Sequence, residues 1–209
     1  MTVDPAFWHE RWQQGRIAFH EARVNAYLER HADRLATYPR VLVPMCGKSE
    51  DLAFLASHGH DVVGVELVEA AVVAFFAEHG IAPVVTARGA LIEYVAPAIT
   101  VFQGDVFATT PEVIGAIDAI YDRAALVALP ADMRPRYVAH LRGLAPKRVL
   151  LVAFEYDQTQ MAGPPFAVAE TEVRALYAGA TIELLSEGPD PRVRENWPPA
   201  IERCYAVTL

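Results

Sequence analysis

The chain has 209 residues, enough for one domain with a substantial hydrophobic core. Hydrophobic residues make up 53% of it and charged residues only 21%, a balance that excludes a disordered chain. The formal net charge of -8 and the lack of any basic run argue against a nucleic-acid binder, which presents a basic surface.

Cysteine content and hydropathy give the expected location of the chain. Cys46 and Cys204 are the only cysteines, too few for a disulfide framework. The segment 1–16 lacks the basic start and apolar core of a signal peptide, and no apolar stretch is long enough to span a bilayer. We therefore expect a cytoplasmic protein with no membrane partner.

The N-terminal part is predicted to be helical. Pro5 suits the first position of a helix that Gly15 ends, with Trp8 and Trp12 at helical spacing between them. A second helix is predicted over 24–35. We expect residues 1–36 to form a helical lid on an α/β core of residues 37–209, the two together being a single domain.

From residue 40 onward, short apolar runs alternate with helical patterns. Strands are expected, in chain order, at 40–45, 61–67, 99–107, 117–122 and 148–156. Helices are expected at 49–59, 68–80, 133–145 and 170–179. Strands that alternate with helices predict a doubly wound α/β fold with parallel strands and helices on both faces of the sheet. The near-continuous apolar strands agree with burial on both faces.

The C-terminal part departs from this alternation. Two further strands are predicted at 181–187 and 203–209, and the segment between them contains four prolines, Pro189, Pro191, Pro198 and Pro199. A crossover helix is improbable there, and without a crossover two strands pair antiparallel. The sequence therefore predicts a seven-stranded, mostly parallel sheet with an antiparallel last strand.

The loop after the first strand contains Gly47-Lys48-Ser49, which is how a phosphate-binding loop ends. A Walker A loop also needs glycine five residues before its Gly-Lys pair, where this chain has Leu42. A G-x-G-x-x-G dinucleotide loop is excluded too, because Gly47 is the only glycine between Pro44 and Gly59. The loop therefore lacks the glycines with which such loops bind a triphosphate or a pyrophosphate.

An acidic residue nevertheless stands where nucleotide-binding folds hold a ribose. Glu66 ends the second predicted strand, nineteen residues after Gly47. A carboxylate at this place accepts hydrogen bonds from ribose hydroxyls. Ribose recognition without a phosphate loop indicates an adenosine ligand that has no phosphates, and S-adenosylmethionine is the obvious candidate. The alternative is an exposed carboxylate at the end of a strand.

Two more polar residues follow strands at the same edge of the predicted sheet, where open α/β folds bind ligands. Asp105 follows the third strand and could border an adenine, or could belong to a turn with Gly104. Arg123 follows the fourth strand and is either a cation of the site or the ion-pair partner of Asp122.

Six segments in consistent order carry a family resemblance. They are "FWHERWQQGRIAFH", "VLVPMCGKSEDL", "VVGVEL", "GDVF", "IYDRAALVALP" and "EYDQTQMAGPPFAV". With these segments the chain resembles the bacterial type of the thiopurine S-methyltransferase family over nearly its whole length. The resemblance implies a class I methyltransferase fold of the Rossmann-like type. It also implies methyl transfer from S-adenosyl-L-methionine to aromatic and heterocyclic thiols such as thiopurines.

The resemblance also implies roles for individual residues. On the cofactor side, Trp12 would pack on S-adenosylmethionine, Met45 would line its pocket, and Glu66 would hold the ribose. Asp105 and Val106 would border the adenine.

On the acceptor side, the resemblance implies that Phe19 contacts the aromatic ring. Arg123 would reach both the cofactor and the acceptor, and it is the predicted catalytic residue, stabilising the acceptor thiolate. The chain departs from the family at Val68, where serine is frequent, and at Met45, where leucine is usual.

Several alternatives remain open at this point. One is a related thiol or halide methyltransferase, or one that acts on selenium or tellurium oxyanions. Another is a protein that binds S-adenosylmethionine without catalysis. A nucleic-acid methyltransferase is disfavoured, because "YDRAAL" stands where an Asn/Asp-Pro-Pro-aromatic segment would follow the fourth strand. No metal site is convincing in the sequence, and we expect a monomer.

Overall fold

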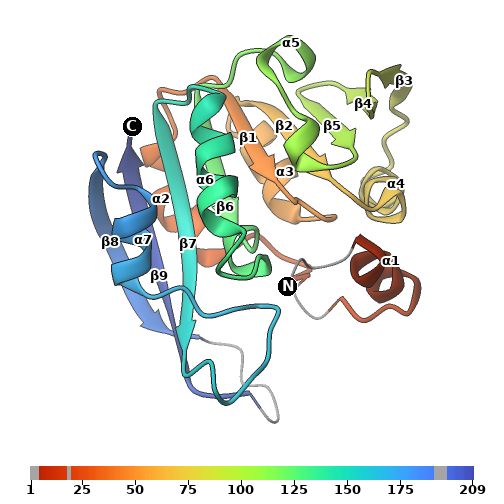
Figure 1. The fold of residues 1–209 in the computed structure, drawn as a ribbon. Helices are drawn as coiled ribbons and strands as arrows, with labels where there is room; N and C mark the ends of the chain where they lie inside the picture. The colour runs from red at the N-terminus through yellow and green to blue at the C-terminus, as the bar shows by residue number, and fades with distance from the viewer. Residues whose placement is uncertain (1–4, 18–19, 191–196) are drawn as a thin grey trace.

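The structure is a computed structural model that describes residues 5–17, 20–190 and 197–209 (Figure 1). Within these residues, nine strands form one sheet in the order β3-β4-β5-β2-β1-β6-β7-β9-β8. The strands are β1 (Arg40–Pro44), β2 (Asp61–Glu66), β3 (Val84–Arg88), β4 (Leu91–Ala96), β5 (Ile99–Gln103), β6 (Ala119–Arg123), β7 (Arg148–Tyr156), β8 (Thr181–Pro189) and β9 (Ala200–Thr208).

The helices connect these strands and flank the sheet. The α-helices are α1 (Pro5–Gln13), α2 (Ala26–His31), α3 (Glu50–Ser57), α4 (Glu69–Glu78), α5 (Pro111–Ile114), α6 (Arg134–Gly143) and α7 (Glu170–Leu176). Short 3₁₀-helices are η1 (Ala32–Arg34), η2 (Val106–Ala108) and η3 (Leu126–Ala128). Of the described helices, none is long and apolar enough to cross a membrane.

The strand directions agree with the predicted α/β class. β5, β2, β1, β6 and β7 are parallel neighbours in the middle of the sheet. β9 pairs antiparallel with both β7 and β8, so the expected antiparallel last strand is confirmed. The four prolines from the end of β8 to the residue before β9 agree with this reversal, because proline disfavours the helix that a parallel return would need.

The strand count of seven was too low. β3 and β4 form an antiparallel hairpin that adds to the sheet beside β5. All five residues of β3 are exposed, so this strand has no buried apolar side and gives no periodic signal in the sequence. The hairpin therefore extends the predicted sheet at one edge without changing its centre.

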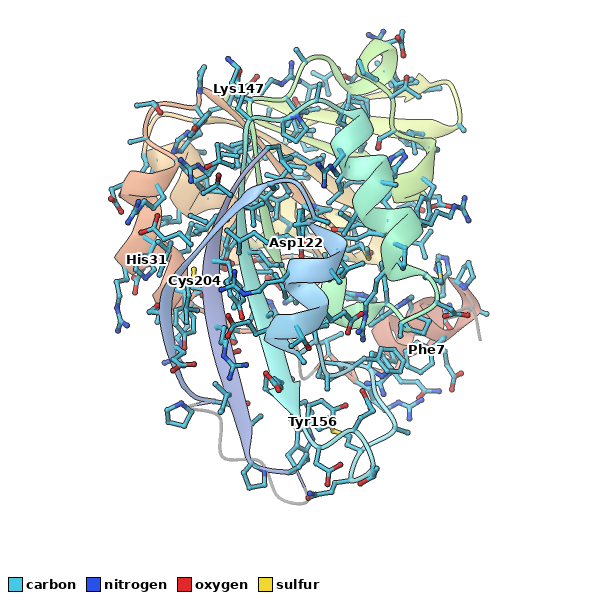
Figure 2. The ribbon with its side chains drawn as sticks, turned by 60° about the vertical axis from the view of Figure 1, so that its left-hand side comes forward. Phe7, His31, Asp122, Lys147, Tyr156 and Cys204 are labelled. Atoms are coloured by element: carbon cyan, nitrogen blue, oxygen red, sulfur yellow. The ribbon has the colours of Figure 1, made fainter. Side chains whose placement is uncertain are left out.

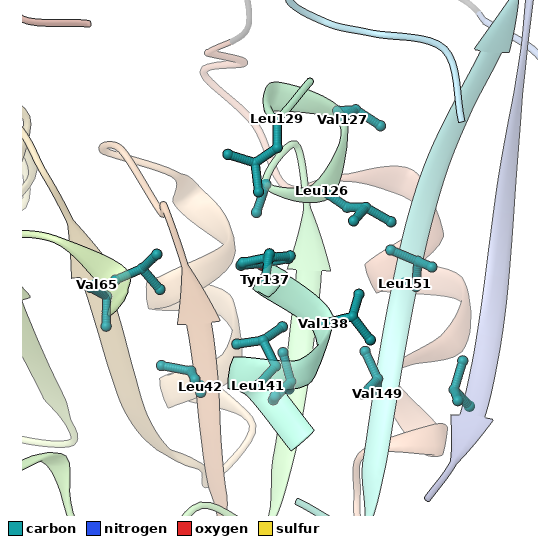
Figure 3. Packing of buried hydrophobic residues seen from close by; sticks show 14 of the residues in the cluster. Leu42, Val65, Leu126, Val127, Leu129, Tyr137, Val138, Leu141, Val149 and Leu151 are labelled. Carbon is teal, nitrogen blue, oxygen red and sulfur yellow. The ribbon is translucent and has the colours of Figure 1, made fainter. Parts of the chain in front are cut away.

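Both faces of the central strands are buried under helices (Figure 1). Leu42 of β1 points to the face that α6 covers, where it belongs to one core cluster with Tyr137 and Leu141 (Figure 3). Its neighbour Val43 belongs to the cluster of the opposite face, together with Leu52 of α3. Alternation between two buried faces explains why β1 reads as a continuous apolar run.

The topology opens a crevice between β1 and β6. From β1 the chain continues to β2 on one side, whereas β6 lies on the other side of β1. In open α/β sheets this switch of direction leaves room for a ligand at the carboxyl ends of the strands. Lys147 and Tyr156 mark the amino and carboxyl ends of β7 in Figure 2. Helix α1 lies beyond the carboxyl end of the sheet (Figure 1).

Candidate active site

A cavity of about 300 Å³ lies at the carboxyl ends of the central strands. Its walls come from the loops that follow β1, β2, β5 and β6, from the first helix, and from Pro164 and Pro165 after β7. The cavity is lined by these predicted site residues: Trp12, Met45, Glu66, Asp105, Val106 and Arg123. Phe19 lies outside the described residues. The roles of the individual residues stay predictions.

The loop after β1 is shaped by backbone in the left-handed region. Met45 has φ of 47° and Gly47 has φ of 56°, a conformation that side chains other than glycine seldom adopt. A Cβ atom at Gly47 would lie 3.4 Å from Cζ2 of Trp12. The indole of α1 therefore approaches the bare backbone of this loop.

Lys48 and Ser49, the other two residues of this segment, have structural roles. The Ser49 side chain caps α3 by accepting a hydrogen bond from the Asp51 amide at 3.2 Å. Lys48 Nζ lies 2.5 Å from Glu78 Oε1 of α4. The segment that resembles a phosphate loop is thus a turn, an ion pair and a helix cap.

Glu66 is 6% exposed, so the alternative of an exposed strand-end carboxylate is wrong. Its Oε2 accepts a hydrogen bond from the Gly47 amide and its Oε1 accepts one from the Val68 amide, each at 2.8 Å. Burial raises the pKa of this carboxyl, and the backbone N–H bonds oppose the rise. A carboxylate offers about four acceptor positions, so Glu66 can also receive the two hydroxyls of a ribose.

The loop after β5 provides a second wall. Asp105 is exposed, and its side chain caps η2 by accepting from the Phe107 amide at 2.9 Å. Val106 is buried beside it. The guanidinium carbon of Arg136 lies 4.1 Å from the centre of the Phe107 ring. Sequence reasoning gave no role to Phe107, although it belongs to the "GDVF" segment, and it missed Arg136, which no quoted segment contains.

Arg123 has a partner that the sequence did not suggest. Its Nη2 forms an ion pair with the carboxylate of Glu21, which precedes α2. The suggested partner, Asp122, instead accepts hydrogen bonds from the Leu126 amide and the Tyr137 hydroxyl. The two neighbours are on opposite sides of β6, because side chains alternate along a strand. A separation of 102 residues hid the true pair from sequence reasoning.

Asp51 of α3 is a buried carboxylate at the cavity that sequence reasoning also missed. Its Oδ1 accepts from the Asn25 amide at 2.8 Å and its Oδ2 from the Tyr121 hydroxyl at 3.0 Å. Burial raises the pKa of Asp51, while these hydrogen bonds and the charge of Arg123 oppose the rise. The sequence signal that could have identified Asp51 is its position directly before Leu52, on the apolar face of the predicted helix.

Metal binding finds no support in the described ranges, where no group of three or more His, Cys, Asp or Glu side chains could hold an ion. The groups at the cavity instead fit an adenosine-type ligand. The buried carboxylate of Glu66 has acceptor positions that suit ribose hydroxyls, and the Trp12 indole packs against the bare backbone of Gly47 beside it. These residues therefore fit S-adenosylmethionine.

Solved structures share this fold. The 1,6-didemethyltoxoflavin-N1-methyltransferase of Burkholderia thailandensis superposes with a TM-score of 0.66 at 18% identity, covering 98% of this chain and 87% of that one. The magnesium protoporphyrin IX methyltransferase of Synechocystis PCC 6803, solved with bound S-adenosylmethionine, has a TM-score of 0.64 at 16% identity, covering 99% and 98%. The fold is therefore that of the class I S-adenosylmethionine-dependent methyltransferases, with a cavity at the carboxyl end of the sheet.

A model of the family described as thiopurine S-methyltransferase matches residues 3–198. The chain belongs to the thiopurine S-methyltransferase family. It is 47% identical over 212 residues to the thiopurine S-methyltransferase of Xanthobacter autotrophicus, covering 98% of this chain and 99% of that one. It is 51% identical over 187 residues to that of Pseudomonas paraeruginosa, covering 87% and 86%. The family expected from the six sequence segments is thereby confirmed.

Proposed function

We propose that this enzyme methylates the sulfur of aromatic and heterocyclic thiols such as thiopurines. The observation that carries the proposal is that Glu66, Arg123 and Trp12 line one cavity. This brings a candidate ribose acceptor, a cation that could act on sulfur and an aromatic cover to the same site. S-adenosylmethionine supplies the methyl group on a positively charged sulfur when it is bound. The family to which the chain belongs supports the thiol as acceptor.

The chain's own residues would bind and orient the two reactants. Glu66 would accept the ribose hydroxyls, and Asp105 and Val106 would border the adenine. Met45 would line the pocket through its loop. Trp12 would cover the cofactor and exclude water, which strengthens the electrostatic interactions inside the cavity.

Arg123 would act on the acceptor. A thiol reacts as its thiolate, and a nearby guanidinium lowers the pKa of a thiol by favouring the charged form. Arg123 is 11% exposed, so little water screens its charge. It would therefore hold the acceptor sulfur in its anionic form within the cavity.

Labelled S-adenosylmethionine with a panel of acceptors tests the function. The panel contains a thiopurine, thiophenol, an aliphatic thiol, selenite and iodide. We expect label in the methylated thiopurine and thiophenol. Methylated selenium or iodide without any methylated thiol would instead identify a related methyltransferase, and no product from any acceptor would contradict the proposal.

Arg123→Ala tests the predicted catalytic residue. We expect turnover to fall by about a hundredfold, as it does when an enzyme loses one group that stabilises a developing or bound anion. Single-turnover kinetics and calorimetric cofactor titration would measure this. Arg34→Ala is the matched control, because Arg34 binds Glu183 on the surface. Full turnover with unchanged cofactor affinity in Arg123→Ala would show that the assignment is wrong.

We further propose that residues 1–36 act as a lid on a single domain, that Phe19 contacts the acceptor ring, and that the enzyme works as a cytoplasmic monomer. The support for Phe19 is the family resemblance of its segment. Light scattering after size-exclusion chromatography would test the monomer, whose chain mass is 23.0 kDa. A particle of twice that mass would contradict it.

A further inference from the structure

The N-terminal segment brings a carboxylate to the arginine of the cavity. Glu21 is 16% exposed and its partner Arg123 is 11% exposed, so this ion pair is shielded from most of the solvent. Shielding makes its attraction stronger than that of a surface ion pair. Arg123 therefore does not present an isolated positive charge to a ligand.

Glu21 reaches Arg123 from outside the active-site cavity. The described residues that line that cavity include Arg123 and His20, whereas Glu21 lines a neighbouring cavity with Arg30 and Glu202. A bound acceptor would therefore meet the guanidinium but not the carboxylate behind it. Glu21 can influence the acceptor only through Arg123.

Other charged groups complete the surroundings of this pair. Asp51, on α3, lies close enough for the charge of Arg123 to affect its pKa. Arg23 lies 3.5 Å from Glu21 but is 69% exposed, so water weakens its effect. The guanidinium thus forms its ion pair with Glu21, while the Asp51 oxygens are held by the Asn25 amide and the Tyr121 hydroxyl. The carboxylate that directly offsets the charge of Arg123 is that of Glu21.

We propose that Glu21 determines which acceptors the enzyme prefers by offsetting part of the positive charge of Arg123, so that the remaining charge suffices for one thiolate but not for a second anionic group. Acceptors with no anionic group other than the reacting sulfur are favoured, and aromatic thiols that also carry a carboxylate are disfavoured. This inference rests on the proposed thiol methylation and defines its substrate class. An added carboxylate would lose its hydration in a largely apolar cavity, where the carboxylate of Glu21 already pairs with the guanidinium of Arg123.

Glu21→Gln removes the charge while keeping the size and hydrogen-bonding ability of the side chain. The two acceptors are thiophenol and para-mercaptobenzoate, which differ by one carboxylate on the same ring. We expect the ratio of their kcat/KM values to shift about tenfold toward para-mercaptobenzoate in the variant, a size typical of one close charge pair. Comparing this ratio between variant and wild type cancels the intrinsic reactivity of the two thiols.

Glu10→Gln is the matched control, because Glu10 lies on the same N-terminal segment but pairs with Arg16 at 58% exposure. It removes an equal charge far from the guanidinium, so the ratio should stay at the wild-type value. An equal shift in both variants would mean that overall charge, not Glu21, sets the preference, and it would overturn the proposal.

A binding measurement that needs no turnover gives a second readout. Benzoate and its uncharged analogue benzamide are titrated while tryptophan fluorescence is followed, with Trp8 and Trp12 at the cavity as reporters. We expect Glu21→Gln to bind benzoate about tenfold more tightly and benzamide with unchanged affinity. An unchanged benzoate affinity in a variant with native circular dichroism would overturn the proposal. The proposal would also be overturned if Glu21→Gln lost activity equally on both thiols and bound the cofactor more weakly. That result would mean that Glu21 only holds the N-terminal segment in place.

Different results would contradict the proposed thiol methylation and the proposed effect of Glu21 on acceptor charge. If the wild-type enzyme methylates no thiol, the proposed function is wrong, and the comparison of benzoate with benzamide still decides whether Glu21 sets the charge preference. If thiols are methylated and neither readout changes in Glu21→Gln, only the charge preference is wrong.

Discussion

Glu66 holds two parts of the site together before any ligand arrives. Its two oxygens bind the amides of Gly47, in the loop after β1, and Val68, which directly precedes α4. Because the loop is already fixed, little backbone entropy remains to be lost when a ligand binds there. The same carboxylate thus stabilises the structure of the site, and we expect it also to bind a ribose.

Glu66→Gln should disturb both duties. The amide would turn an NH₂ group toward one of the two backbone N–H donors, which leaves that donor unsatisfied at a cost of about 1–3 kcal/mol. We expect a lower melting temperature and a cofactor dissociation constant raised at least tenfold, measured by calorimetry. Glu69→Gln makes the same change at an exposed position of α4 and should bind normally. Cofactor affinity of Glu66→Gln within twofold of wild type would refute the ribose assignment.

Three of the site residues predicted from the sequence lie at the carboxyl end of a strand or just after it. Glu66, Asp105 and Arg123 could be brought together because parallel strands place their carboxyl ends at one edge. Glu21 and Asp51 could not, because their positions depend on how the N-terminal segment and α3 pack. Such long-range packing leaves no periodic or spacing signal in a single sequence.

Helix α1 forms one wall of the cavity while none of its nine residues is buried. It therefore contributes little to the hydrophobic core, and its aromatic side chains are available to a ligand. An unburied helix adds little to stability, because isolated helices of this length are marginal in water. We therefore expect α1 to serve as a cover of the cavity.

Trp12→Ala tests this cover. We expect the cofactor dissociation constant to rise roughly ten- to hundredfold, because an indole buries a large apolar area on its ligand. The melting temperature should change little, because Trp12 lies outside the core clusters. Phe7→Ala is the control, since Phe7 packs on Trp8 and Arg11 of its own helix. A large loss of stability without weaker cofactor binding would make Trp12 a structural residue.

The unpredicted hairpin also supports the site. Leu91, the first residue of β4, is buried, and a Cβ atom at Gly104 would lie 2.5 Å from its Cδ2. Gly104 lines the cavity directly before the predicted adenine neighbours. The hairpin could not be predicted because β3 is exposed throughout. Its second strand, β4, nevertheless packs on the wall of the cavity through Leu91.

At the scale of the molecule, the parallel centre of the sheet was predictable and its edge was not. β1, β2, β5, β6 and β7 are apolar on both faces, which is a strong signal, and their order follows the rules of doubly wound sheets. The predicted helices 49–59, 68–80, 133–145 and 170–179 correspond to α3, α4, α6 and α7, with ends that differ by at most three residues. Local capping and turn interactions determine where each helix ends, so the ends differ slightly from the periodic pattern.

The stability of the whole molecule should depend on pH through Asp122, which lies buried in the interior (Figure 2). Burial raises the pKa of Asp122 from 3.8 to about 6, and the Leu126 amide and Tyr137 hydroxyl oppose the rise. Between these two pH values the folded state binds more protons than the unfolded state. The free energy of unfolding therefore falls as pH rises through this window, by about 3 kcal/mol from this group.

Asp122→Asn should remove most of this dependence. An asparagine can still accept from the Leu126 amide and donate to the Tyr137 oxygen, so the fold should persist. Urea unfolding of both proteins at pH 4.5 and 7 would show a smaller difference between the two pH values for the variant. Asp61→Asn, at an exposed strand start, is the control. Equal pH dependence of wild type and Asp122→Asn would contradict the assignment.

The reversal of β9 also determines where the enzyme can be attached to other molecules. Because β9 runs against β7, the amide of Leu209 binds the Lys147 carbonyl at 3.2 Å, at the amino end of β7. Figure 2 places Lys147 at the opposite end of the molecule from Phe7 of α1. A fusion partner or a solid support joined after Leu209 would leave the mouth of the cavity open, whereas one joined ahead of α1 would stand beside it.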